Sequence, residues 1–478
     1  MRGPNYGKHT ENSQKMKNTS LLRDSKKTRW IVLMIVSLVM FAAYVASDNI
    51  FAVETTLTQA VDNGGAYGIL PSEYSSLAGA YSIFNVYLLM LIFGGIILDR
   101  KGIRFTGIMS TVLMVIGVGM MTWTFFDLRA EVAAGHEMGV INFLGDDVRV
   151  PVLPAVIGMG IYGVGAEIAG ITVTKIIAKW FVGYEMALAM GLQLSLARLG
   201  TGLAYGATPG IVGLFSGNVG VAVLIGLILL IVGFVLYLVY CVYDKKLDAQ
   251  ISAAGASDGS EGADEEKFNI HDVLAVVKNP GFWMIAFLCL LFYAAVNPFL
   301  KYSTGMMVGK FGISESLAGL FPSILPMGCI VLSPIFGGIY DKKGHGADLM
   351  MLGAGIIALV HLCFALLPGN ASPVFPIILM VCLGIGFSLL PAAMWPSVAK
   401  IIPARQLGTA MALTFYIQNI GFIFVPKAIR AIQGATEGYF WFSIFFTGLG
   451  VCAILLSLGI RVLDSKKHYH LQEPNIQQ

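Results

Sequence analysis

The chain has 478 residues, of which 56% are apolar and only 12% are charged, and its formal net charge is +3. A soluble domain carries roughly 25% charged residues, and the mean hydropathy here is +0.76. The composition therefore excludes a soluble globular protein and predicts an all-α membrane protein. Because no basic segment is interleaved with aromatic residues, it also argues against nucleic-acid binding.

The chain begins with a polar stretch, residues 1–29, which we interpret as a disordered cytoplasmic arm. No small-residue cleavage site follows it, so we do not expect a signal peptide. Apolar runs of the roughly 20 residues that a spanning helix needs come next. We predict twelve transmembrane helices, over residues 30–54, 75–98, 104–126, 152–177, 185–208, 218–242, 281–303, 315–340, 347–368, 373–399, 406–431 and 437–462.

The distribution of Lys and Arg predicts the orientation of these helices. An even number of spans places both termini on one side of the membrane. The arm and the loops near residues 100–104, 245–246, 342–343 and 405 are rich in Lys and Arg, whereas the opposite loops are acidic or neutral. Since loops rich in Lys and Arg stay in the cytoplasm, we expect both termini to be cytoplasmic.

A change of composition divides the apolar chain into two halves. Residues 244–266 are rich in Gly, Ala, Ser and acidic residues and lack apolar periodicity, which is typical of a flexible linker. We therefore predict an N-terminal six-helix bundle over residues 30–243, a cytoplasmic linker over 244–278 with a short helix at 271–277, a C-terminal six-helix bundle over 279–463, and a cytoplasmic tail over 464–478.

One short phrase occurs once in each half. GIILDRKG, residues 95–102, follows the second predicted span, and GGIYDKKG, residues 337–344, follows the eighth. Each copy has a glycine four residues before an aspartate, then two cations and another glycine. Internal repeats in a membrane protein indicate two pseudo-symmetric halves with a substrate site between them.

The residue types in this phrase predict a conformational latch. The last glycine of each copy supplies the backbone angles of a tight turn, and the first glycine lets neighbouring helices approach closely. The aspartate can accept hydrogen bonds from a helix N-terminus across the repeat interface. The alternative is a charged turn kept by topology alone, but two copies in register favour the latch. The predicted latch residues are Gly95, Asp99, Arg100, Gly102, Arg104, Gly337, Asp341 and Gly344.

The first copy, with an aliphatic residue before Asp99-Arg100-x-Gly102-x-Arg104, resembles the signature loop of major facilitator superfamily transporters. The second copy, around Asp341, resembles the weaker C-terminal counterpart of that loop. The resemblance extends along nearly the whole chain. It implies the major facilitator fold, with twelve helices in two six-helix pseudo-symmetric bundles, and it says nothing about the substrate.

Two charged residues lie in the middle of predicted spans. Glu167 lies in the fourth span and Arg198 in the fifth, where a charge costs about 3 kcal/mol or more. These spans form a hairpin that turns near residues 182–183, and both charges are equally far from that turn. With a uniform rise per residue, the hairpin brings Glu167 and Arg198 to the same depth, near the bilayer midplane.

This pair of charges has two interpretations. A structural buried ion pair often contributes little net stability. In the other interpretation the pair binds a zwitterion, with Arg198 holding a carboxylate bidentately and Glu167 accepting an ammonium. Because charges inside a membrane mark substrate pathways by default, we favour the zwitterion site.

The segments around the pair carry a narrower resemblance. They are WFVGYE at 180–185 and GLQLSLARLG at 191–200, with MWP at 394–396, QLGTA at 406–410 and IQNIG at 417–421 in the second half. Together they resemble the lysosomal dipeptide transporters, the major facilitator superfamily domain-containing protein 1 group. This resemblance implies facilitated transport of dipeptides, with Glu167 and Arg198 matching the charged pair that holds the peptide termini. Because an acidic dileucine sorting signal is not evident, we predict a bacterial inner membrane first and a lysosomal membrane second.

The superfamily resemblance also places other residues near the ligand, because spans one, four, seven and ten normally line the cavity. Asp48 is equally suited to binding an ammonium and to stabilising the first span. Trp395 offers an apolar wall or a cation–π face, with ordinary packing as the alternative. Lys427 and Arg430 lie nearer the outer face and are expected to snorkel. The predicted substrate-binding residues are Glu167, Arg198, Asp48, Tyr44, Tyr293, Asn297, Trp395, Gln418 and Asn419.

No enzyme chemistry, cofactor or metal site is expected. Ser195 has no histidine base in its span, and no glycine-rich phosphate loop is present. The seven histidines form no HExxH or CxxC pattern, and the six cysteines lie in or beside apolar spans. The expected partners are a small zwitterionic substrate and the lipid bilayer, without nucleic acid or an accessory subunit. The alternatives are a proton-coupled symporter of another small organic ion, and a non-transporting membrane sensor or scaffold.

Overall fold

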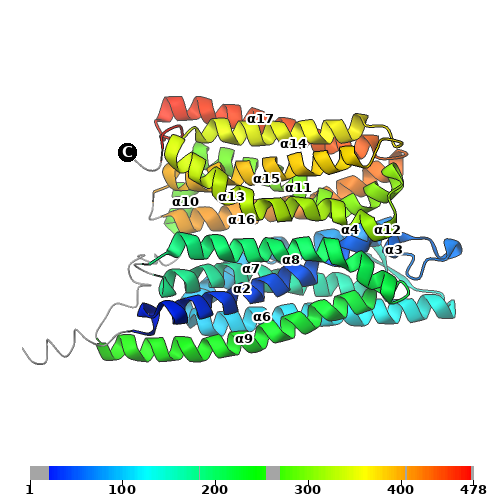
Figure 1. The fold of residues 1–478 in the computed structure, drawn as a ribbon, viewed down its shortest axis with the longest axis horizontal. Coiled ribbons are helices and arrows are strands. Elements are labelled where there is room, and N and C mark those ends of the chain that lie inside the picture. Colours follow the sequence, from blue (N-terminus) through cyan, green and yellow to red (C-terminus); the bar gives the residue numbers. More distant parts are fainter. Residues whose placement is uncertain (1–20, 182–183, 255–269, 404–405, 475–478) are drawn as a thin grey trace, which may run out of the picture.

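The structure, a computed structural model, describes residues 21–181, 184–254, 270–403 and 406–474. Two helical bundles, one from each half of the chain, lie one above the other (Figure 1). The N-terminal bundle consists of α2 (Lys26–Asp48), α3 (Glu54–Thr58), α4 (Pro71–Ala80), α5 (Ile83–Tyr87), α6 (Met90–Ala134), α7 (Leu153–Trp180), α8 (Met186–Leu214) and α9 (Val219–Ala254). The C-terminal bundle consists of α10 (Ile270–Val277), α11 (Pro280–Phe311), α12 (Glu315–Ala318), α13 (Leu320–Lys343), α14 (Gly346–Leu366), α15 (Val374–Ile401), α16 (Leu407–Ala435) and α17 (Phe440–Lys467).

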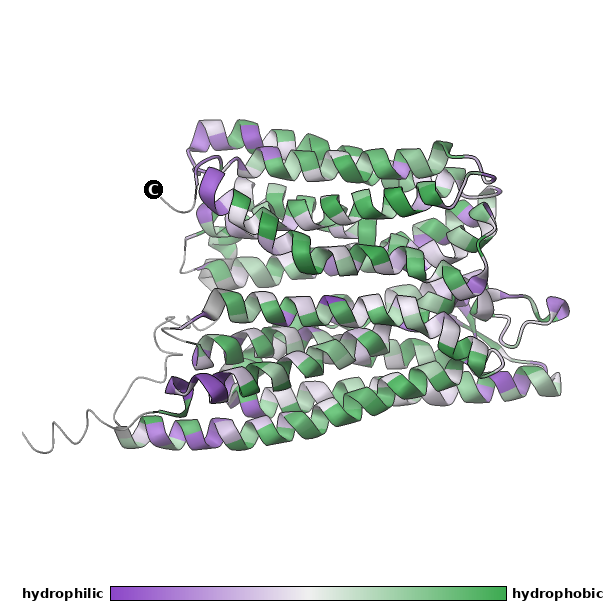
Figure 2. Ribbon diagram, in the orientation of Figure 1, coloured by the Kyte–Doolittle hydropathy of each residue, from purple (hydrophilic) through white to green (hydrophobic). Residues whose placement is uncertain are grey.

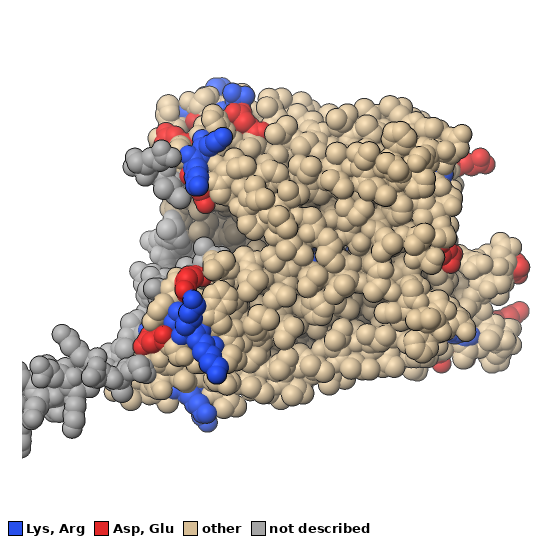
Figure 3. All heavy atoms as spheres, in the orientation of Figure 1, with Lys and Arg blue, Asp and Glu red and all other residues tan. Residues whose placement is uncertain are grey.

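The two ends of the molecule differ. One end, which we name the terminal face, carries the start of α2 and the ends of α9 and α17. The opposite end, the hairpin face, carries an antiparallel β-hairpin of β1 (Val140–Phe143) and β2 (Asp146–Arg149). Hydrophilic residues gather at both ends of the helices, and apolar residues occupy the middle (Figure 2). In the view of Figure 3 the charged side chains likewise lie at the two ends. This distribution is that of a multi-pass membrane protein.

Ten helices within the described residues are long and apolar enough to cross a membrane. Two predicted spans are not among them. The fifth span, α8, carries Gln193 and Arg198, which make it more polar. The second span, predicted as one helix over residues 75–98, is broken into α4, α5 and the start of α6, with Leu89 in the left-handed region at φ 55°. Nothing in the local sequence predicts a leucine at this backbone angle, which costs free energy for any residue except glycine.

Several helices extend beyond their predicted ends. We expected the linker to begin at residue 244, but α9 continues to Ala254. Its polar last turns are stabilised by ion pairs within the N-terminal half, because Asp244 and Asp248 accept from Lys179 on α7 at 3.0 and 2.5 Å. The helix expected at residues 271–277 forms as α10. Residues 1–20 of the arm and 255–269 of the linker lie outside the described residues.

The repeated phrase forms turns at its last glycines, with φ of 76° at Gly102 and 70° at Gly344. The close helix approach expected at Gly95 and Gly337 is not found, since a Cβ added at either position meets only open space. Arg104 binds Asp244 and Asp248 of its own half at 3.1 and 2.6 Å. The side chain of Asp99 lies outside the described part of the chain.

Candidate substrate site

A cavity of about 380 Å³ lies between the two bundles, within the roughly 300–1,000 Å³ of small-molecule sites. We call it the central cavity. The N-terminal bundle contributes α2, α4, α7 and α8 to its wall, and the C-terminal bundle contributes α11, α15 and α16. All of the predicted substrate-binding residues except Asn419 line it: Tyr44, Asp48, Glu167, Arg198, Tyr293, Asn297, Trp395 and Gln418.

Glu167 and Arg198 line the same cavity without touching each other. Within the described residues no ion pair joins them, so the structural ion pair considered above does not form. The Glu167 carboxylate instead accepts a hydrogen bond from the Tyr81 hydroxyl at 3.1 Å. Tyr81 lies in the break between α4 and α5.

The Arg198 guanidinium has no hydrogen-bond acceptor among the described residues. Its Cζ lies 5.2 Å from the centroid of the Phe387 ring, a cation–π contact that leaves its N–H groups unused. The side chain is half-buried. A guanidinium must satisfy its donors when it leaves bulk water, and the contents of the central cavity can do so here.

The C-terminal bundle gives the cavity an aromatic wall. The indole Nε1 of Trp395 donates to the Tyr293 hydroxyl at 3.3 Å, and its ring lies 5.0 Å from the ring of Phe415, centroid to centroid. Asn419 is not among the residues that line the cavity, although it neighbours Glu167. Its amide oxygen accepts a hydrogen bond from the Ser82 hydroxyl at 2.5 Å and so links the two halves.

Two lining residues that the sequence reasoning missed are Tyr81 and Lys301. Tyr81 was missed because the second span was expected to be continuous. Lys301 lies two residues before the predicted end of the seventh span. A lysine at such a position can extend to the membrane surface, so it did not indicate a binding site. The helix α11 in fact continues to Phe311, which places Lys301 well inside the bundle. The apolar residues that follow residue 303 were the sequence feature that could have predicted this longer helix.

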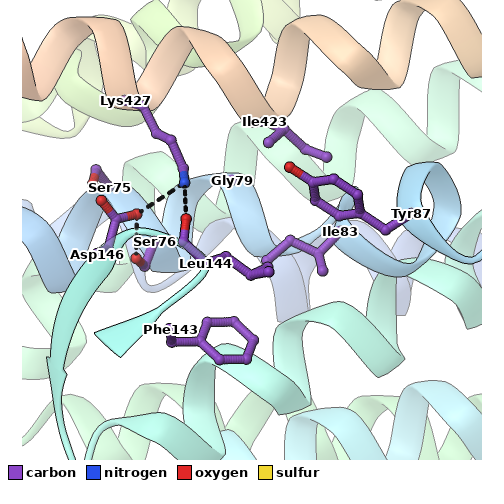
Figure 4. A pocket seen from close by; sticks show the side chains of 10 residues that line it. All are labelled: Ser75, Ser76, Gly79, Ile83, Tyr87, Phe143, Leu144, Asp146, Ile423 and Lys427. Carbon is purple, nitrogen blue, oxygen red and sulfur yellow. Dashed lines mark hydrogen bonds and ion pairs between the residues drawn. The ribbon is translucent and has the colours of Figure 1, made fainter. Parts of the chain in front are cut away.

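The halves are held together on the hairpin face by the β-hairpin (Figure 4). The buried carboxylate of Asp146 forms ion pairs with Arg430 at 2.5 Å and Lys427 at 3.5 Å, both on α16. It also accepts from the Ser76 hydroxyl of α4 at 2.8 Å, and Lys427 donates to the Leu144 carbonyl. Lys427 and Arg430, which were expected to snorkel towards the outer face, have side chains that are 32% and 35% exposed and that reach the carboxylate of the hairpin.

Further contacts close the hairpin face. Arg149 of the hairpin binds Glu73 of α4 at 2.6 Å, which fixes the hairpin to the N-terminal bundle. The Glu54 carboxylate accepts from the backbone N–H of Gly305 on α11 at 2.8 Å. A Cβ at Gly305 would lie 2.5 Å from that carboxylate, so the end of the Glu54 side chain would have to shift. On the terminal face, by contrast, the surface is hollowed between the halves (Figure 3).

A multi-pass helical protein with two bundles around a central cavity lined by charges of both signs is a membrane transporter. The chain belongs to the Major Facilitator Superfamily, whose family profile matches residues 19–426.

Among curated proteins, the lysosomal dipeptide transporter MFSD1 of Danio rerio is 27% identical over 448 residues, covering 92% of this chain and 88% of the relative. MFSD1 of Homo sapiens is 26% identical over 446 residues, covering 91% and 85%. Among solved structures, the peptide transporter POT in complex with sulfate has a TM-score of 0.65 at 15% identity, covering 92% of this chain and 96% of that one. The nucleoside transporter NupG has a TM-score of 0.61 at 13% identity, covering 90% and 98%. At these identities the two structures show the fold alone.

Proposed function

We propose that the protein transports small zwitterionic peptides, in particular dipeptides, by alternating access and facilitative uniport. The observation that carries the proposal is the Arg198 guanidinium, which faces the central cavity without an acceptor among the described residues. Glu167 faces the same cavity without a cation partner there. The names of the MFSD1 relatives support a dipeptide as the zwitterion.

The chemistry of the two side chains assigns the ends of the substrate. The planar fork of Arg198 matches a peptide carboxylate, which it can bind through a pair of parallel hydrogen bonds. Glu167, held by Tyr81, accepts the ammonium at the other end. The aromatic wall around Trp395 then faces the side chains of the peptide. Tyr44, Asn297 and Gln418 supply further polar contacts.

The charges of the cavity favour uniport over ion-coupled transport. Its charged lining residues are Asp48 and Glu167 against Arg198 and Lys301, so that the formal charges cancel. A zwitterion adds no net charge. The site can therefore switch between the two sides of the membrane without carrying an additional ion, whether it is empty or holds a zwitterion. A proton symporter would instead need a carboxylate that changes protonation in each cycle.

Alternating access then means rocking of the two bundles about the cavity. In the conformation described, the β-hairpin closes one face, and that contact must break when the other side opens. We further propose that the phrase around Asp99 and Asp341 is the latch of the terminal face, and that this face is cytoplasmic because its loops carry the Lys and Arg residues. The membrane of residence, for which we favour a bacterial inner membrane over a lysosomal one, remains a prediction.

Binding to the purified protein tests the substrate class. Thermal stability is measured with Ala-Ala, with N-acetyl-Ala-Ala, with Ala-Ala-amide, and with the doubly blocked peptide. We expect a concentration-dependent rise of the melting temperature with Ala-Ala, because a ligand of the native state stabilises it. We expect smaller rises for the singly blocked peptides and none for the doubly blocked peptide. Equal stabilisation by all four peptides, or by none, contradicts the proposal.

A further inference from the structure

Lys301 is the one charged residue that the C-terminal bundle contributes to the described lining of the central cavity. Its ammonium crosses to the N-terminal bundle, where it donates to the Ala78 carbonyl at 2.6 Å. It also lies 4.3 Å from the centroid of the Phe51 ring. Asp48 on α2 lines the same cavity and attracts the ammonium electrostatically. The ammonium is therefore surrounded by groups of the other bundle.

Each of these groups recognises a cation for a separate physical reason. Ala78 belongs to the last turn of α4, where backbone carbonyls lack helical partners and the helix dipole is negative. The face of the Phe51 ring attracts a cation through its quadrupole. The Asp48 carboxylate, which lines the same cavity, supplies a formal negative charge. Helix ends of broken spans form ion sites in other membrane transporters by the same physics. We name the arrangement of Ala78, Phe51 and Asp48 the cation subsite.

In this structure the cation subsite is filled by the protein's own side chain. The Lys301 ammonium therefore affects the net charge of the cavity that a ligand enters. With Lys301 in place, Asp48 is compensated, and Glu167 remains as the acidic group for the ammonium of a zwitterion. Without Lys301, the charged lining would be Asp48 and Glu167 against Arg198, with one negative charge in excess.

We propose, on the basis of the function proposed above, that Lys301 is the specificity-determining residue of the cavity. Its ammonium occupies the cation subsite and so makes the transporter select dipeptides with neutral side chains over those with a cationic side chain. Removal of the ammonium opens the subsite to an external cation. The lysine side chain of a dipeptide, which carries the same ammonium on the same alkyl stem, is the natural occupant.

The first arm of the test measures selectivity. Dissociation constants of Ala-Ala and Ala-Lys are determined for the wild type, for Lys301→Ala and for Lys301→Gln, which keeps a polar side chain of similar reach. We expect the preference for Ala-Ala over Ala-Lys to fall by about tenfold in both variants, the effect of one recovered cation contact. The double variant Asp48→Asn/Lys301→Gln restores neutrality and is expected to regain most of the wild-type preference. An unchanged ratio of the two constants in both single variants overturns the proposal.

The second arm does not depend on peptides. The melting temperature of Lys301→Ala is measured with n-butylammonium chloride and, as a matched neutral probe, with n-butanol at the same ionic strength. We expect stabilisation by n-butylammonium alone, and its loss in Asp48→Asn/Lys301→Ala. Equal effects of the two probes, or an equal n-butylammonium effect on the wild type, overturn the cation subsite. If the wild type binds no dipeptide, the proposed function fails, while this arm still reports on the subsite.

Discussion

Replacement of Arg198 by alanine removes the group on which the proposed substrate site depends, and the structure predicts what remains. The guanidinium donates no hydrogen bond to the described residues, so its loss leaves no protein acceptor unpaired. Glu167 keeps its hydrogen bond from Tyr81 at 3.1 Å. The Phe387 ring loses only a cation–π contact at 5.2 Å. We therefore expect Arg198→Ala to fold, to insert and to keep a melting temperature close to that of the wild type.

The effect on binding should be much larger than the effect on stability. A hydrogen bond to a charged group contributes about 1.5–3 kcal/mol, and the guanidinium forms a pair of them with a carboxylate. Because Arg198 is half-buried and water reaches the cavity, we take the lower end, about 3 kcal/mol for the pair. At about 1.4 kcal/mol for each factor of ten, the dissociation constant of Ala-Ala rises roughly 100-fold. Arg198→Lys keeps the charge and loses the fork, so we expect roughly a tenfold rise.

Calorimetry with two ligands measures this effect. Ala-Ala carries the carboxylate, and Ala-Ala-amide serves as the matched control without it. Arg198→Ala should weaken Ala-Ala strongly and change the already weak binding of Ala-Ala-amide little. If both ligands lose affinity by the same factor, or if the variant unfolds, Arg198 has a structural role and the assignment of the carboxylate end is wrong.

Three other predictions follow from the same geometry. Glu167→Gln should weaken Ala-Ala roughly tenfold, the loss of one charged hydrogen bond, and N-acetyl-Ala-Ala much less; equal losses in calorimetry would exclude ammonium binding. Asp146→Asn should remove the ion pairs with Arg430 and Lys427 and destabilise the closed state of the hairpin face by about 1 kcal/mol. A cysteine placed in the cavity should then be labelled roughly fivefold faster from that face. Asp147→Asn, whose carboxylate contacts Asn142 within the hairpin, is the matched control, and equal labelling rates for the two variants would refute a closing role. Asp99→Asn should lower the turnover of transport without changing the affinity for Ala-Ala, whereas the exposed loop variant Asp62→Asn should change neither; a normal turnover in Asp99→Asn would remove the latch.

The amino-acid sequence predicts the fold well because a bilayer imposes strong constraints on it. Apolar runs predict the spans, and the repeated phrase predicts the two halves. Both features can be read from the sequence because neither depends on contacts between distant residues. The placement of Glu167 and Arg198 around one cavity also follows from counting residues along a hairpin. Depth does not fix the direction of a side chain around its helix, however. The ion pair between them was therefore a possibility that only the packed structure could exclude.

The remaining differences arise where a distant segment supplies a partner. Lys427 and Arg430 were expected to snorkel because they lie nearer the outer face, and their sequence neighbourhood does not show that Asp146 reaches them from the β-hairpin in the opposite half. The hairpin turns at Leu144 and Gly145, both with positive φ.

Uptake of labelled Ala-Ala into liposomes containing the purified protein tests the central claim most directly. The liposomes have equal pH inside and outside, and the time course is followed to its plateau, with Arg198→Ala as the inactive control. Facilitative uniport predicts uptake that stops when the internal concentration equals the external one, and an imposed inward proton gradient leaves that plateau unchanged. Accumulation above the external concentration under the proton gradient, or no uptake beyond that of Arg198→Ala, would contradict the account.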